Sequence, residues 1–126
     1  MEIVIRTQVA IIGGGPSGLL LSHLLDQVGI DSVILEKKSR NHVLSRVRAG
    51  VLEWGTVEML RNSGLGSRMD KEGFIHKGTY LSSQNKGFRV DFQKLVKNKV
   101  MVYGQTEVTA DLYASSDKRS KIIIHD

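Results

Sequence analysis

The sequence predicts an α/β fold built around a short parallel sheet, and three observations lead to that prediction. A β-branched apolar run, Gln8 to Ile12, ends at a cluster of glycines. A helical pattern of leucines follows the cluster, and a second apolar run, "SVILE", follows the helix. Strands joined through a helix in this way form a right-handed crossover and lie parallel. We therefore expect residues 1–126 to form one α/β domain.

Local signals justify the first strand and the first helix. The run from Gln8 to Ile12 is too short for a helix and is bounded by glycine, which favours a buried strand. Pro16 suits the first turn of a helix, where its missing N–H costs nothing. The helix is expected from Ser17 to Val28, with Gly29 as its stop. Apolar residues at spacings of three and four predict its packed face: Leu20, Leu21, Leu24, Leu25 and Val28.

The stretch "GGGPSG" between this strand and helix has the glycine spacing of a dinucleotide-binding turn. Gly13 would permit the tight turn, Gly15 would let the backbone approach a pyrophosphate, and Gly18 would let the helix pack closely on the strand. The helix would then direct its free N–H groups at the phosphates. Glu36 lies 18 residues beyond Gly18, at the end of the second strand, where a carboxylate can accept hydrogen bonds from a ribose. The prediction is a Rossmann-like dinucleotide-binding domain.

The kind of dinucleotide is less constrained, because flavin and nicotinamide cofactors share this geometry. A carboxylate at position 36 disfavours the 2′-phosphate of NADP at this same site, so FAD or NAD fits better. Arg46 and Arg48 precede a predicted amphipathic helix that carries Leu52, Val57 and Leu60 and closes near Gly64. On an extended segment the two arginines would face one side and reach a phosphate or a flavin edge. The alternative is a pair of exposed charges.

The remaining elements are expected to be mostly strands. The segment "GTYLSSQNKGFRVDFQ" alternates apolar and polar residues on both sides of "NKG", which predicts an inserted antiparallel β-hairpin. We expect a strand at "KVMVYG", the start of a helix at "QTEVTADLYA", and a buried strand at "KIIIHD" that joins the parallel sheet beside the first two.

Composition limits the possible partners and location. The formal net charge is +5, but the basic stretches "EKKSRNHVLSRVR" and "SDKRSK" read as solvated loops or element edges. They lack interleaved aromatic residues, so no nucleic-acid partner is expected. The chain has no cysteine, and its longest apolar runs fall short of a membrane span. "MEIVIR" does not read as a signal peptide. We expect a cytoplasmic protein that does not contact a membrane.

No metal site or hydrolytic site is expected. The four histidines, His23, His42, His76 and His125, show no metal-ligand spacing, so each is expected to be hydrogen-bonded or exposed. Ser17 does not stand in the nucleophile motif G-x-S-x-G.

Three collinear stretches indicate a family. "TQVAIIGGGPSGLLLSHLLDQVGIDSVILEK", "SRVRAGVLE" and "VYGQTEVTADL" closely resemble the N-terminal region of the 4-hydroxybenzoate 3-monooxygenase family, the flavin-dependent para-hydroxybenzoate hydroxylases. The resemblance runs from about Thr7 to Leu112. It implies a Rossmann-like FAD-binding domain, NADPH as reductant, 4-hydroxybenzoate as the aromatic substrate, and a role in the catabolism of aromatic compounds.

The resemblance also implies roles for particular residues. The turn Gly13, Gly15, Ser17 and Gly18 would bind the pyrophosphate of FAD, and Glu36 the adenosine ribose. The segment Arg46, Arg48, Ala49, Gly50 and Val51 would line the flavin side, and Gln105 would contact FAD. Residues matching Lys37 to Arg46 influence NADPH recognition in the family, and their surplus of cations here suits a phosphorylated cofactor. The connection "YASSDKRSK" is shorter than the family pattern suggests, so we expect a curtailed helix there.

No catalytic residue is implied, because the family's substrate and interface domains are expected to be absent from residues 1–126. Two interpretations stay open. The chain is either the FAD-binding portion of an aromatic-ring monooxygenase or a truncated, stand-alone dinucleotide-binding module without hydroxylase activity. In the second case the open sheet edge at "KIIIHD" would favour self-association.

Overall fold

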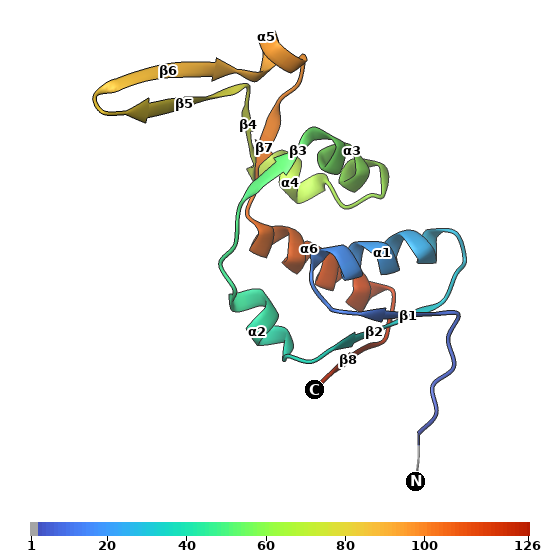
Figure 1. Ribbon diagram of the computed structural model, residues 1–126. Helices are drawn as coiled ribbons and strands as arrows, with labels where there is room; N and C mark the ends of the chain where they lie inside the picture. The colour runs from blue at the N-terminus through green and yellow to red at the C-terminus, as the bar shows by residue number, and fades with distance from the viewer. Residues whose placement is uncertain (1–2) are drawn as a thin grey trace. The chain divides into compact units, whose positions relative to one another are not determined.

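The computed structural model describes residues 3–126, which form two compact units (Figure 1). The parallel-sheet unit contains the residues up to Arg48 together with Gln105–Asp126. The antiparallel unit contains Ala49–Gly104. The second unit is thus inserted, in sequence, between two segments of the first.

Three parallel strands form the sheet of the parallel-sheet unit: β1 (Val9–Ile12), β2 (Ser32–Glu36) and β8 (Ile123–His125). Their order is β1-β2-β8, with Ala10 opposite Val33 and Ile34 opposite Ile123. The prediction that the last strand joins the first two is therefore confirmed. This order, in which each new strand adds beside the previous one, is that of one half of a Rossmann fold.

Helices α1 (Pro16–Gln27) and α6 (Gln105–Lys118) pack against each other on the same side of this sheet (Figure 1). The predicted packed face of α1 is correct only in part, because Leu20, Leu24 and Leu25 are half-buried but are not its most buried residues. Leu19, Ser22 and His23 are buried, whereas Leu21 and Val28 are 45% and 70% exposed. The reason is Gly18, which must face β1 and so fixes the rotation of the helix about its axis.

The polar residues buried by this rotation have partners. The Ser22 and Ser32 hydroxyls are 2.8 Å apart, and Nδ1 of His23 lies 3.0 Å from the Ser115 hydroxyl. The interpretation of His23 as a hydrogen-bonded histidine is confirmed.

Two segments expected to be loops are helical. Helix α2 (Arg40–Ser45) lies within the first basic stretch, and the Ser39 hydroxyl caps it by accepting a hydrogen bond from the His42 N–H. Helix α6 runs for 14 residues to Lys118 and so extends into the second basic stretch. The sequence does not predict the C-terminal turns of α6, because small and polar residues there replace the apolar repeat that marks a helix.

The antiparallel unit contains two small sheets. Strands β3 (Val51–Glu53), β7 (Val100–Val102) and β4 (Phe74–His76) form one sheet in the order β3-β7-β4. Helices α3 (Trp54–Asn62) and α4 (Ser67–Glu72) belong to the same unit. Its buried residues include Val57, Leu60, Met69 and Met101. Leu52, expected on a helix, lies instead in β3 opposite Met101. That pairing joins residues far apart in sequence, so local periodicity does not reveal it.

The second sheet is the predicted hairpin, made of β5 (Gly78–Ser83) and β6 (Lys86–Asp91), and helix α5 (Phe92–Val96) follows it. The hairpin is confirmed, but its turn lies one residue earlier than "NKG". Gln84 and Asn85 have φ values of 48° and 62°, which is the two-residue turn that matches the twist of paired strands.

Candidate functional site

The glycine turn between β1 and α1 needs glycine at two positions for different reasons. Gly13 has φ +111°, a conformation that other residues rarely adopt. At Gly18 the space is filled, because a Cβ would lie 2.0 Å from the Gly13 carbonyl oxygen and 3.2 Å from Cγ2 of Ile11. The first glycine therefore makes the turn, and Gly18 lets α1 pass close to β1.

Gly15 differs from both, because the space beside it is open. It is the N-cap of α1, with φ −77°, and no heavy atom lies within 4 Å of the position its Cβ would take. The first hydrogen bond of the helix runs from the Leu19 N–H to the Gly15 carbonyl at 3.0 Å. The N–H groups of the first turn precede this bond, as at any helix start, and they suit an anion.

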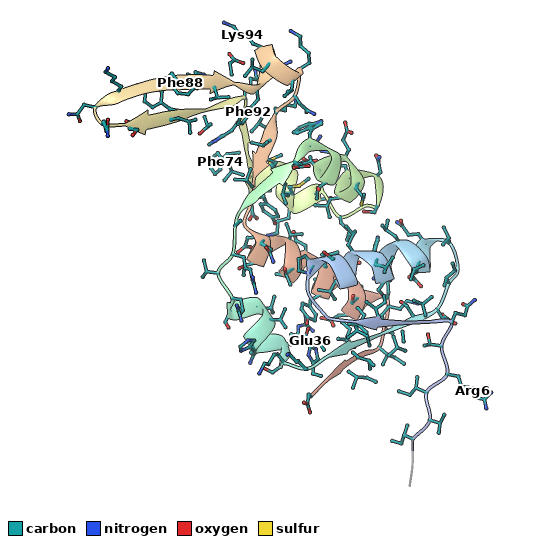
Figure 2. All side chains as sticks on the ribbon, viewed as in Figure 1. Arg6, Glu36, Phe74, Phe88, Phe92 and Lys94 are labelled. Atoms are coloured by element: carbon teal, nitrogen blue, oxygen red, sulfur yellow. The ribbon has the colours of Figure 1, made fainter. Side chains whose placement is uncertain are left out.

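Glu36, labelled in Figure 2, is the last residue of β2, and its carboxylate contacts the glycine turn. Its Oε2 accepts a hydrogen bond from the Gly14 N–H at 2.7 Å, and its Oε1 accepts one from the Lys38 N–H at 2.9 Å. The Gly14 hydrogen bond is the main cause that lowers the pKa of Glu36, with a smaller contribution from Lys38, while burial acts in the opposite direction. The carboxylate therefore stays ionised while it holds the turn.

The middle glycine is part of this arrangement. A Cβ on Gly14 would lie 3.0 Å from Cβ of Glu36, so a side chain there would crowd the carboxylate. Sequence analysis missed this contact. The signal that could have revealed it is a third consecutive glycine combined with an acid at the end of the next strand.

A hollow of about 240 Å³ opens beside the turn, within the parallel-sheet unit. We call it the glycine-turn hollow. Two helix starts contribute to it: Gly15 and Pro16 from α1, and Gln105 and Thr106 from α6. The other lining residues are Glu36, Lys38, His42, Val43, Arg46, Arg48 and Thr109.

The structure brings five of the predicted site residues to this hollow: Gly15, Glu36, Arg46, Arg48 and Gln105. Gly13, Ser17 and Gly18 belong to the same turn and helix start but do not line the hollow. The exposed Ala49, the half-buried Gly50 and Val51, the first residue of β3, belong to the antiparallel unit. The Gly50 carbonyl accepts a hydrogen bond from the Tyr103 N–H at 2.8 Å.

The sequence did not assign six further lining residues to the FAD site: Pro16, Lys38, His42, Val43, Thr106 and Thr109. Thr106 fixes part of the geometry, because its hydroxyl donates to the Arg46 carbonyl at 3.2 Å. That bond ties the start of α6 to the extended chain that follows α2. The lining contains three cationic side chains, Lys38, Arg46 and Arg48, and one carboxylate, that of Glu36. Its net positive charge favours an anionic ligand.

An ion pair attaches α2 to α6. The Arg40 guanidinium donates two hydrogen bonds to the Asp117 carboxylate, at 3.0 and 2.7 Å, and lies 4.5 Å from the centroid of the Tyr113 ring. Arg40 lowers the pKa of Asp117, and burial raises the pKa of Tyr113. The position of α2 relative to the glycine-turn hollow therefore depends on an exposed salt bridge and a buried ring.

Residues 3–126 contain neither a membrane-spanning helix nor a cluster of metal ligands. No helix there is long and apolar enough to cross a membrane, and no three potential ligands among His, Asp and Glu come together as a metal site.

The parallel sheet, the glycine turn and the acid at the end of β2 define a Rossmann-like dinucleotide-binding fold. The family model of the FAD binding domain matches residues 6–125. The chain belongs to this FAD-binding domain family. Membership of the family indicates FAD as the cofactor.

Curated relatives of the chain include a hydroxylase and a halogenase. Over 114 residues the chain is 45% identical to p-hydroxybenzoate hydroxylase of Acinetobacter baylyi, a match that covers 90% of this chain and 28% of the hydroxylase. This confirms the resemblance inferred from the sequence. A flavin-dependent halogenase of Armillaria mellea is 40% identical over 73 residues, which are 56% of this chain and 13% of the halogenase.

Solved structures show the same fold at low identity. PqsL of Pseudomonas aeruginosa, in complex with 2-aminobenzoylacetate, matches with a TM-score of 0.83 at 15% identity over 94% of this chain and 33% of PqsL. The p-nitrophenol 4-monooxygenase PnpA of Pseudomonas putida matches with a TM-score of 0.80 at 23% identity, over 96% of this chain and 32% of PnpA. The chain spans about a third of the length of these monooxygenases.

Proposed function

We propose that the chain binds FAD in the glycine-turn hollow. The observation that supports this best is the open space beside Gly15, at the start of α1, in a hollow with several cations and a second helix start. A pyrophosphate needs close backbone approach, free N–H donors and positive charge, and this place offers all three.

The proposed contacts follow the turn and the hollow. Gly13, Gly15, Ser17 and Gly18 would hold the pyrophosphate. Glu36 would accept hydrogen bonds from the adenosine ribose, because a carboxylate has about four acceptor positions and the backbone bonds to Gly14 and Lys38 use two of them. Arg46, Arg48 and Gln105 would contact the cofactor from the other side of the hollow.

Three more contacts are proposed on the family resemblance. Ala49, Gly50 and Val51 would lie at the flavin side of the cofactor. Their support is their place in "SRVRAGVLE", directly after the two arginines that line the hollow.

The reaction that we propose for the whole protein is aromatic hydroxylation. Bound FAD would supply the redox chemistry by which NADPH and dioxygen convert 4-hydroxybenzoate to 3,4-dihydroxybenzoate. Support comes from the 45% identity to p-hydroxybenzoate hydroxylase. For NADPH, the support is the row of cations from Lys37 to Arg46, of which Lys38 and Arg46 line the hollow.

A second candidate is a dinucleotide-binding module without hydroxylase activity. The observation that favours it is that the proposed pyrophosphate and ribose contacts all lie within one compact unit of the chain. Such a module would expose its sheet edges. We propose that it self-associates through β8, where Ile124 is 40% exposed and Ile122, directly before the strand, is 47% exposed.

FAD and FMN together test the cofactor proposal. FMN lacks the pyrophosphate link and the adenosine, so the proposed site should hold FAD but not FMN. We expect saturable changes in flavin fluorescence and a higher melting temperature with FAD alone, because a ligand that binds only the folded state stabilises it. Equal binding of both flavins would contradict the proposed contacts. Turnover of 4-hydroxybenzoate with NADPH would separate the two candidate functions.

A further inference from the structure

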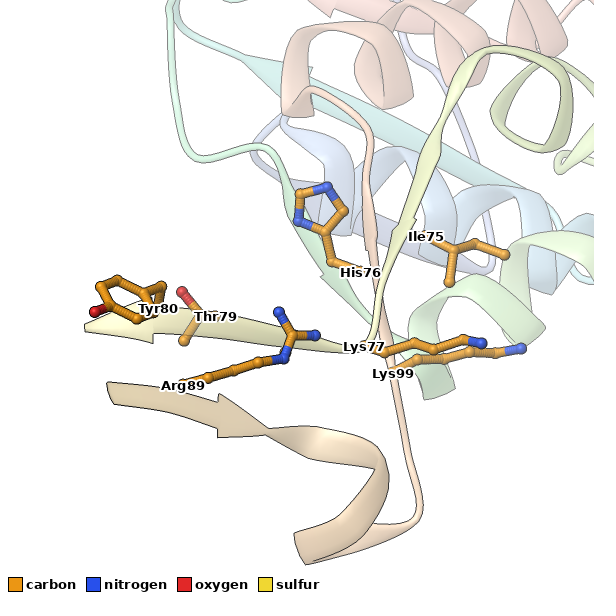
Figure 3. A pocket seen from close by; sticks show the side chains of 8 residues that line it. Ile75, His76, Lys77, Thr79, Tyr80, Arg89 and Lys99 are labelled. Atoms are coloured by element: carbon orange, nitrogen blue, oxygen red, sulfur yellow. The ribbon is translucent and has the colours of Figure 1, made fainter. Parts of the chain in front are cut away.

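A second hollow lies in the antiparallel unit, where β4 leads into β5 (Figure 3). It is an open hollow of about 820 Å³, and we call it the hairpin hollow. Its polar lining consists of His76, Lys77, Thr79, Tyr80, Arg89 and Lys99. No carboxylate is among the residues that line it in the described part of the chain.

The hairpin positions the Arg89 side chain beside this hollow. Tyr80 and Arg89 are directly opposite in the antiparallel register, and Gly78 is two residues before Tyr80 on the same face of β5. The guanidinium lies over Gly78, where a Cβ would be 3.0 Å from Nη2 of Arg89. Figure 3 shows Arg89 reaching from β6 towards β5. Because residue 78 has no side chain, the Arg89 guanidinium can occupy the space over it.

The cations of this region have little acidic compensation. Residues 77–99 contain six lysines and arginines and one acid, Asp91, so their formal charge equals the +5 of the whole chain. The Asp91 carboxylate accepts a hydrogen bond from the Lys94 N–H at 3.0 Å and caps α5. Among residues 3–126, Lys77, Arg89 and Lys99 have no carboxylate within ion-pair distance.

We propose that the hairpin hollow binds the phosphate groups of a small molecule. The Arg89 guanidinium would donate two parallel hydrogen bonds, for which its planar shape suits phosphate. Lys77 and Lys99 would add charge. An anion placed there reduces the repulsion among these cations. The site is separate from the glycine-turn hollow and does not depend on FAD binding.

The single tryptophan of the chain offers a local readout. The Lys99 ammonium lies 4.1 Å from the centroid of the Trp54 ring, so an anion that draws Lys99 towards it would change the fluorescence of Trp54. The titration uses inorganic pyrophosphate and the Gly15→Val chain, in which the other candidate phosphate site is blocked. We expect a saturable change.

Two substitutions connect that change to the hairpin hollow. Arg89→Gln and Lys77→Gln should each weaken pyrophosphate binding, the first by about tenfold, because a charged bidentate contact is lost. Lys94→Gln is the matched control, since Lys94 lies on α5 and does not line the hollow (Figure 2). It should leave the affinity within about twofold.

Three results would overturn the proposal. The first is the absence of a saturable change, and the second is an unchanged affinity in both Arg89→Gln and Lys77→Gln. The third is a single-stranded oligonucleotide that binds more tightly than pyrophosphate and depends on Arg89, because that would assign the surface to nucleic acid.

Discussion

Gly18 has no room for a side chain, because its Cβ would lie 2.0 Å from the Gly13 carbonyl oxygen. We expect Gly18→Ala to lower the free energy of unfolding by about 2–3 kcal/mol, since α1 or β1 must move. Gly15→Ala is the matched control, because nothing lies within 4 Å of that position, and it should cost less than about 1 kcal/mol as a changed N-cap. Urea unfolding followed by circular dichroism measures both values. Equal losses would contradict the assigned role of Gly18.

Glu36 makes stability depend on pH. Its pKa in the folded chain is lowered, mainly by the Gly14 N–H, so its contribution to stability is present above the ordinary value of 4.5 and is lost as the pH falls below it. Glu36→Gln should flatten the decrease in melting temperature between pH 6 and pH 3, a window of about three pH units around that value. The control is Glu58→Gln, an exposed site on α3. Parallel profiles for the unchanged chain and Glu36→Gln would contradict this account.

At the scale of residues, spacing reveals the roles of Gly13 and Gly18 because both roles are local backbone geometry. The contact between Gly14 and Glu36 joins two elements 22 residues apart, and the pattern of the motif does not specify it. His42, Thr106 and Thr109 reach the glycine-turn hollow through the arrangement of helices α2 and α6, which no single motif predicts.

The attachment of α2 to α6 depends on Arg40 and Asp117, whose side chains are 41% and 56% exposed. Because exposed pairs contribute little, Asp117→Asn should change the global free energy of unfolding by less than about 1 kcal/mol. It should nevertheless speed amide hydrogen exchange in residues 40–45, because α2 is short and loses its anchor. Lys118→Gln, one residue further along α6, is the control. Unchanged exchange in Asp117→Asn would show that the ion pair does not hold α2.

At the scale of elements, β1, β2, β7, β8, the hairpin and the existence of α1 follow from the sequence, because apolar runs and turn residues are local signals. Strands β3 and β4 do not follow from it, because each has three residues and forms only by pairing with the distant β7. The packed face of α1 does not, since Gly18 rather than the leucine repeat sets its rotation. Helix α2 lacks an apolar stripe and starts from a serine cap, and Leu52 enters a strand only through its pairing with Met101.

At the scale of the whole molecule, the parallel sheet has two edges, β1 and β8. Ile12, Leu35 and Ile124 are exposed on it and line a shared apolar hollow. If β8 mediates self-association, sedimentation velocity should show concentration-dependent oligomers. Ile124→Lys should reduce them, because a charge on an edge strand opposes pairing. Val47→Lys, at a 95% exposed site outside any strand, should not. A chain that stays monomeric throughout would remove this proposal.

The division into two units is also a property of the whole molecule. The sequence predicts one domain, and nothing local marks Ala49 and Gly104 as the limits of an insertion. The glycine-turn hollow lies within one unit and combines residues from both segments of it, such as Arg48 and Gln105. Sequence order alone does not bring those segments together.

A titration with FAD of the unchanged chain beside Gly15→Val tests the central claim most directly. Flavin fluorescence gives the affinity, and circular dichroism shows that both chains are folded. We predict saturable binding by the unchanged chain and at least about tenfold weaker binding by Gly15→Val, whose side chain would enter the space proposed for the pyrophosphate. Undiminished affinity in a folded Gly15→Val chain would contradict the claim that FAD binds at the glycine turn.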